Sequence, residues 1–294
     1  EERQNRAQIA TIAAGLVFVA AAIAALVVGV RAWMRHRIDQ RALWIMFAVT
    51  ATTTLLTAVN SAPALAFELR TAEPLWSQWL MRVLAIAAGA LVGGLILALV
   101  GGVGAWAART APRQPLSSRL PPWAVAVCAA LLQLGVQTAL ASLAPHSAPI
   151  WPALTLGQWS QPFGALVAGL NFVPLVGVAL FIVYFVARLT HGFTRHAWIG
   201  VAIIVLLESA AGLVQAGGRY TSALVFGFTG GVTAAAVLWW VLRYDLRMLP
   251  AYVATGAIAS ALVRAFQTAT PQGWIVFALG AVVTVAMAWL VTRY

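Results

Sequence analysis

The sequence contains no lysine and only seven acidic residues, so arginine determines its charge. Charged residues make up 9% of the chain and hydrophobic residues 62%. Because soluble domains carry roughly a quarter charged residues, this composition excludes a soluble globular protein and leaves the membrane class. The net charge of +11 comes from arginines in the short connections between apolar runs. That placement is typical of membrane topology and argues against nucleic acid as a partner.

Cysteine and histidine are also scarce. The single cysteine, Cys128, lies in an apolar run, which excludes a disulfide framework and a cysteine-based metal site. The four histidines all fall in loops or at the ends of apolar runs: His36, His146, His191 and His196. Metalloproteases, serine proteases and haem sites need a histidine or an equivalent ligand at the depth of the chemistry. We therefore expect no metal and no cofactor, and the sequence offers no catalytic residues.

Apolar runs of about 20 residues, the length that crosses a bilayer, are abundant. Nine such runs lie near residues 8–30, 42–66, 79–107, 122–143, 162–187, 197–216, 222–242, 250–268 and 273–291. Arginines are concentrated in the connections after the first, third, fifth and seventh runs and at the end of the chain. The positive-inside rule then predicts that the N-terminus lies outside and the C-terminus in the cytoplasm.

These observations predict an all-α fold, a polytopic transmembrane helical bundle of about nine spans. Residues 8–294 are expected to form a single transmembrane domain. Residues 1–7 are expected to be the extracytoplasmic tail of an N-terminal part that this sequence does not include.

Glu208 is the only carboxylate within the apolar runs, and it interrupts residues 197–216 near their middle. An ionisable group at that depth is expensive and normally has a partner, so it is a functional hypothesis by default. Arg264, in the eighth run, is predicted at a similar depth. We predict that Glu208 pairs with Arg264, either as a buried ion pair that fixes helix register or as a proton-coupling site.

A stripe of polar residues and an interrupted helix are further candidates. Thr50, Thr53, Thr57 and Asn60 fall on one face of the second run, which predicts either interhelical hydrogen bonds or a polar conduit. In the fifth run, Asn171 precedes Pro174. Proline removes an amide, so a kink is expected there, and a broken helix can contribute to a transport site.

Glycines mark faces at which another helix backbone can approach closely. In the third run, Gly89 and Gly93 form a small-xxx-small pair. In the seventh run, Gly227, Gly230 and Gly231 give a similar pattern. Both patterns predict close helix packing.

Residues 42–75, which read ALWIMFAVTATTTLLTAVNSAPALAFELRTAEPL, resemble a segment of certain long bacterial members of the CPBP family of intramembrane proteases. These are the CAAX-processing and bacteriocin-processing relatives. The beginning of the chain, EERQNRAQIA, is similar to the tail of an extracytoplasmic domain in those proteins. NFVPL at 171–175 and RMLPAYV at 247–253 look like the stretches that follow the first catalytic motif and precede the third.

This resemblance implies a fold without the family's chemistry. Carried over on those anchors, the paired glutamates of the family fall at Leu166 and Val167, and the arginine of that motif at Asn171. The motif histidines fall near Gly212 and Thr255. None of these residues performs the family's reaction, so the resemblance implies a degenerate relative that has lost proteolysis.

Three functions follow as hypotheses. The first is a non-catalytic CPBP-like protein of the bacterial inner membrane that acts as a scaffold, receptor or subunit of a larger complex. Its partners would be the lipid bilayer and other membrane protein subunits. The second is a proton-coupled transporter that uses Glu208, with Arg264 as counter-ion. The third is an active intramembrane protease.

Overall fold

The computed structural model describes residues 2–63, 74–110, 121–143, 160–191, 195–215, 220–242, 245–268 and 270–293. Nearly all of these residues are helical, and no strand occurs among them. The predicted all-α fold class is therefore confirmed for the described part of the chain.

The helices follow the predicted apolar runs. Their bounds are α1 (Glu2–Met34), α2 (Gln40–Asn60), α4 (Leu75–Ala88), η1 (Gly89–Gly93), α5 (Gly94–Thr110), α6 (Pro122–Leu143), α8 (Gln161–Leu170), α9 (Phe172–Leu189), α10 (Ala197–Gln215), α11 (Tyr220–Val237), η2 (Leu238–Leu242), α12 (Met248–Thr268) and α13 (Pro271–Arg293). The π-helical turns η1 and η2 join α4 to α5 and extend α11. Helix α1 already begins at Glu2, so residues 2–7 of the expected extracytoplasmic tail are helical.

Six helical stretches are long and apolar enough to cross a membrane. They are Ile12–Met34, Gln40–Asn60, Leu75–Thr110, Pro122–Ala139, Gln161–Leu189 and Pro271–Arg293. Three further helices are apolar over shorter stretches: Ala197–Ala211, Gly227–Leu242 and Met248–Val263. The chain is thus a multi-pass helical protein with at least these six candidate spans among its described residues.

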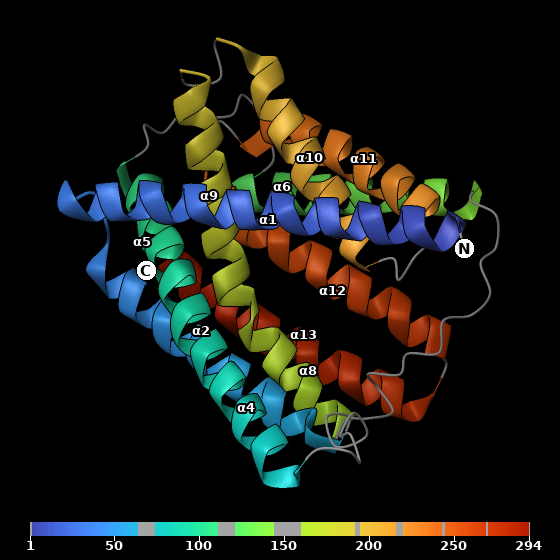
Figure 1. Ribbon diagram of the computed structural model, residues 1–294. Helices are drawn as coiled ribbons and strands as arrows, with labels where there is room; N and C mark the ends of the chain where they lie inside the picture. Colours follow the sequence, from blue (N-terminus) through green and yellow to red (C-terminus); the bar gives the residue numbers. More distant parts are fainter. Residues whose placement is uncertain are drawn as a thin grey trace.

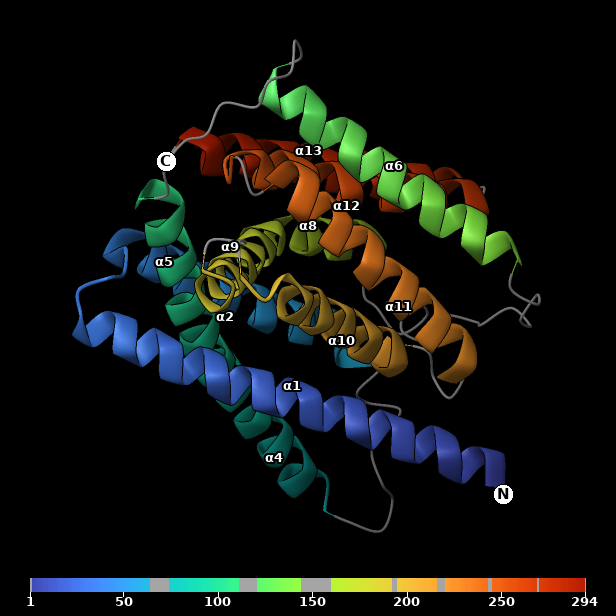
Figure 2. The same ribbon diagram turned by 90° about the horizontal axis from the view of Figure 1, so that it is seen from above.

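Helix α9 lies in the middle of the bundle. In Figure 2, α1 lies on one side of the molecule and α6 with α13 on the other, and α9 lies between them. The two ends of the chain lie at opposite ends of the bundle in both views (Figures 1 and 2). Helix α9 packs against α5, α12, α10, α13 and α2. It therefore connects helices from both halves of the sequence.

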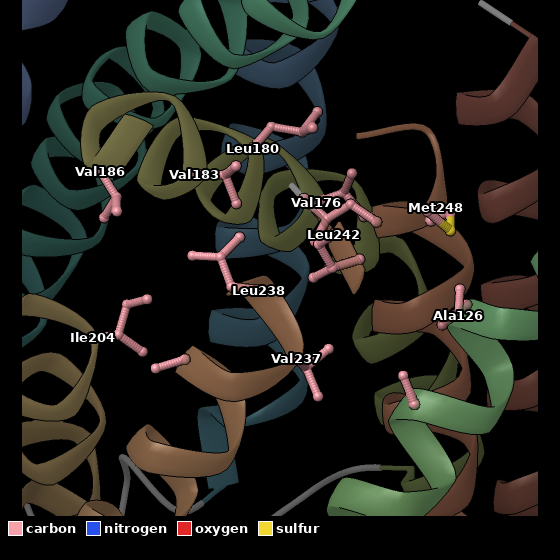
Figure 3. Close-up of a cluster of buried hydrophobic side chains, with 14 of the residues drawn as sticks. Ala126, Val176, Leu180, Val183, Val186, Ile204, Val237, Leu238, Leu242 and Met248 are labelled. Carbon is pink, nitrogen blue, oxygen red and sulfur yellow. The ribbon is translucent and has the colours of Figure 1, made fainter. Parts of the chain in front are cut away.

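The largest hydrophobic cluster surrounds α9. Val176, Leu180, Val183 and Val186 of α9 are buried, and they contact residues from α10, α11, η2 and α12. In Figure 3, Val183 lies above Leu238 and Val176 lies beside Leu242. Because both sides of α9 are covered, its sequence is apolar all around rather than on one stripe.

Close helix contacts occur at glycines, but not at all of those predicted. At Gly89 and Gly93 an added methyl group would meet nothing within 4 Å, so the predicted close packing at this pair is wrong. Helix α5 makes its close contacts further along the chain. A methyl group at Gly104 would lie 2.9 Å from the Gly177 carbonyl of α9. The pair at Gly89 and Gly93 lies in η1, before α5 reaches α9.

The prediction for the seventh run is confirmed. A methyl group at Gly231 on α11 would lie 2.5 Å from the Val205 Cα on α10, and Gly227 is equally close to the next turn of that helix. Helices α10 and α11 therefore touch along their backbones, and this contact fixes the position of Glu208.

Candidate functional site

Glu208 lies near the middle of α10, about 16 Å along the helix from Ala197 at the usual rise of 1.5 Å per residue. This is about half the thickness of a bilayer's hydrocarbon core. Its side chain is exposed at the surface of the chain and is not sealed in the hydrophobic cluster. The carboxylate therefore lies at the surface of the chain rather than in its hydrophobic core.

Gly230 of α11 makes room for a polar contact beside Glu208. A methyl group at Gly230 would lie 3.0 Å from Gln137 Nε2 of α6 and 4.0 Å from Glu208 Oε2 of α10. The missing side chain therefore allows an amide and a carboxylate from two helices to converge on the same glycine. An amide N–H is a donor that suits an ionised carboxylate.

Tyr252 of α12 belongs to the same group of polar side chains. Its hydroxyl donates a hydrogen bond to Gln133 Oε1 of α6. The Glu208 carboxylate lies within electrostatic range of this hydroxyl. Gln133 and Gln137 are one helical turn apart and share a face of α6. We call Gln133, Gln137, Glu208 and Tyr252 the Glu208 cluster.

The chemistry of the Glu208 cluster is that of proton or cation binding. It combines one carboxylate, two amides and one phenol, none of which is an activated nucleophile. The described residues contain no group of three or more His, Cys, Asp or Glu side chains that could hold a metal ion.

The predicted partner of Glu208 was Arg264, whose side chain lies outside the part of the chain that the structure describes. Tyr252 lies on the same helix as Arg264 but about 18 Å closer to its start, at 1.5 Å per residue. Helix α10 packs mainly against α11, α1 and α9, whereas α12 packs mainly against α13, α6 and α9. The ion pair between Glu208 and Arg264 stays a prediction.

The polar stripe of α2 lies apart from the Glu208 cluster. Thr50, Thr53 and Asn60 are buried, whereas Thr57 is exposed. The Thr53 hydroxyl donates to the Thr50 carbonyl of its own helix at 3.1 Å, and Asn60 Oδ1 accepts the Ser160 backbone N–H at 3.1 Å. Helix α2 packs against α5, α8 and α9, so the stripe is joined to α8 through Asn60.

The chain is interrupted between α8 and α9 at Asn171, three residues before Pro174. Asn171 donates its N–H to the Val167 carbonyl at 3.1 Å, and its own carbonyl accepts the Leu175 N–H at 3.2 Å. Proline has no N–H to donate to the carbonyl four residues earlier, which explains why the regular ladder breaks here. Pro174 is buried, so the break lies inside the bundle.

Sequence reasoning missed Gln133, Gln137 and Tyr252. The signal was available for the two glutamines, because they stand four residues apart in the apolar run of α6 and must share a face. Tyr252 carries no such signal, since a tyrosine near a helix start is also common at membrane interfaces. Which helices meet at Glu208 depends on the tertiary packing of α6, α10, α11 and α12.

Comparison of the sequence with family models and curated proteins, and of the structure with solved structures, finds no match.

Proposed function

We propose that this chain is a proton-coupled membrane carrier in which Glu208 takes up and releases the proton. The observation that carries the proposal is the carboxylate of Glu208 near the middle of α10, with Gln137 Nε2 beside the same glycine, Gly230, and the Tyr252 hydroxyl within electrostatic range. An intramembrane acid with polar neighbours from several helices is typical of proton relays in transporters. A cationic substrate would compete with the proton for the same carboxylate.

We propose the topology that the arginine distribution predicts. The chain crosses a bacterial inner membrane nine times, with its N-terminus outside and its C-terminus in the cytoplasm. In support, the arginine-bearing ends of α2, α5, α12 and α13 gather around one cavity. Those of α1 and α9 gather around a second one. With this topology, α10 runs outward from the cytoplasmic face and Glu208 lies near the bilayer midplane.

The mechanism requires Glu208 to exchange its proton between two environments. When the carboxylate is ionised, we expect the Gln137 amide, which lies beside the same glycine, Gly230, to move toward it and donate a hydrogen bond. When the carboxyl group is protonated, it needs no such donor and fits an apolar environment at lower cost. The break at Asn171 is not part of this step, because α8 and α9 contribute no side chain to the Glu208 cluster.

The test is proton flux into proteoliposomes, followed with an internal pH indicator after an imposed pH gradient and membrane potential. We expect flux in the native protein, its loss in Glu208→Gln, and partial retention in Glu208→Asp. Asp245→Asn is the matched control, since Asp245 is an acid that precedes α12 and bonds the Arg247 backbone N–H at 2.9 Å. A native protein without flux, or a folded Glu208→Gln variant with full flux, contradicts the proposal.

A second candidate function is the non-catalytic, CPBP-like scaffold or subunit of a membrane complex. The favouring observation is the pair Gly89 and Gly93, whose faces meet nothing within 4 Å in this chain. Such small residues on a membrane helix allow a partner helix to approach closely. Replacing both with leucine should then reduce recovery of partner subunits from mild detergent, whereas Glu208→Gln should not. Equal recovery with the leucine variant contradicts this candidate.

A further inference from the structure

A cavity of about 830 Å³ opens between the ends of four helices, away from the Glu208 cluster. Its arginines come from the start of α2, the end of α5, the residue before α12 and the end of α13: Arg41, Arg109, Arg247 and Arg293. We propose that this cavity binds an anionic phospholipid, with the phosphate at the arginines and the acyl chains against the apolar wall. The proposal is independent of proton transport.

The interior of the cavity is apolar. Met46 of α2, Val176 of α9 and Met287 of α13 contribute to its wall, which continues the hydrophobic core around α9. Ile45 and Leu290 also line it and are 42% and 38% exposed. The proposal requires that the wall at these two partly exposed residues opens toward the bilayer, so that the acyl chains leave the cavity sideways.

The charge of the lining favours an anion. The described lining contains four arginines and no acidic side chain. Asp39 offsets one of them, because its Oδ2 lies 2.6 Å from Arg109 NH1. Asp245 is held by the Arg247 backbone N–H at 2.9 Å. Even with both acids counted, positive charge remains in excess at the cavity mouth, and arginine binds phosphate oxygens in a bidentate manner.

Arginines at cytoplasmic helix ends are expected from topology alone, so they do not by themselves indicate a site. What distinguishes this group is the extensive apolar wall beneath it, in a cavity whose volume lies within the range for ligand pockets. Basic pockets between transmembrane helices on the cytoplasmic side are known to suit anionic headgroups. A water-soluble anion would use the arginines but not the apolar wall.

A second hollow serves as an internal control. It lies between α1 and α9, has a volume of about 650 Å³, and is lined by Arg31, Arg35, Arg37 and Arg188. Arg188 NH1 donates to the Tyr184 hydroxyl at 2.9 Å in this hollow. Removing two arginines here changes the net charge by the same amount as removing two from the proposed lipid site, but it leaves that site intact.

The experiment is a titration of delipidated protein in detergent with phosphatidylglycerol, with bound lipid counted by native mass spectrometry. Phosphatidylcholine is the zwitterionic comparison. We expect tighter binding of phosphatidylglycerol, weakened about tenfold or more in Arg247→Gln/Arg293→Gln. The double variant Arg31→Gln/Arg35→Gln should bind as the native protein does, and Arg247→Lys/Arg293→Lys should keep most of the affinity.

A second variant tests the apolar wall without changing charge. Ala105 lines the cavity from α5, so Ala105→Phe should occupy it and weaken phosphatidylglycerol binding while the arginines remain. Size-exclusion profiles and thermal unfolding report whether each variant is folded. Equal binding of the two lipids, or equal losses in the two arginine-to-glutamine variants, overturns the proposal. Displacement of the lipid by millimolar inorganic phosphate indicates a soluble anion site and also overturns it.

Discussion

Gly227 of α11 lies directly against the backbone of Ser209 on α10. A methyl group at Gly227 would lie 2.8 Å from the neighbouring Glu208 carbonyl and closer still to the Ser209 Cα. Because backbone atoms cannot rotate away, this contact sets the separation of the two helices. The position of the Glu208 carboxylate beside Gly230 therefore depends on a glycine one turn earlier on α11.

The first prediction concerns this contact. Gly227→Ala should lower the free energy of unfolding by about 1–3 kcal/mol, the usual effect of inserting a methyl group into a closed contact. Gly89→Ala is the matched control, since nothing lies within 4 Å of that position and alanine favours a helix. Thermal or SDS-induced unfolding in one detergent measures both variants. Equal destabilisation by the two substitutions would show that α10 and α11 are not closely packed.

The second prediction concerns the hydrogen bond between Tyr252 and Gln133. Tyr252→Phe and Gln133→Leu should each destabilise the protein, because each leaves a polar partner unsatisfied. The double variant should lose less free energy of unfolding than the sum of the losses in the two single variants. The coupling expected for a hydrogen bond between membrane helices is about 0.6–1.7 kcal/mol. A double-mutant cycle on unfolding free energies gives this value, and a coupling of zero contradicts the contact.

The helices themselves could be predicted because length and apolarity determine them. Each of the nine apolar runs corresponds to helix in the structure, and the interruption at Asn171 falls where Pro174 removes an amide. Six of the runs meet the length and hydropathy expected of a full span within the described residues. These features are local, so they follow from sequence without knowledge of tertiary contacts.

Partner choice could not be predicted in the same way. Gly89 and Gly93 have the same spacing signature as a packing pair, yet α5 meets α9 further along, at Gly101 and Gly104. Thr57 shares the predicted stripe with Thr53, but Thr57 is exposed and Thr53 is buried. In both cases the crossing point of two helices decides which residues are covered, and one sequence does not specify that point.

The third prediction concerns Thr50, whose buried Oγ1 makes no hydrogen bond within the described part of the chain. Thr50→Val keeps the shape of the side chain and removes the unsatisfied hydroxyl. We expect stability to rise by about 1 kcal/mol. Thr53→Val is the matched control, because Thr53 Oγ1 donates to the Thr50 carbonyl at 3.1 Å and its loss should give no gain. Unfolding in detergent distinguishes the two, and a destabilised Thr50→Val variant indicates a bound water or ligand at that hydroxyl.

The fourth prediction separates two roles of Asp39. Its Oδ1 accepts the Ala42 N–H at 3.0 Å and so caps α2, while its Oδ2 pairs with Arg109 across to α5 at 2.6 Å. Asn also caps helices well but carries no charge, so Asp39→Asn should lose only the ion pair. Because Arg109 is half exposed, this loss should lower the free energy of unfolding by roughly 0.5–1 kcal/mol.

Asp39→Ala should lose the cap as well, so its free energy of unfolding should be about 1 kcal/mol lower than that of Asp39→Asn. The ion pair is screened by salt whereas the cap is not, so high salt should reduce the difference between the native protein and Asp39→Asn but leave the difference between the Asn and Ala variants unchanged. Unfolding at low and high salt checks both expectations. Equal stability of the Asn and Ala variants would mean that the hydrogen bond to Ala42 contributes nothing, and that α2 begins where it does only because Asp39 is tied to α5.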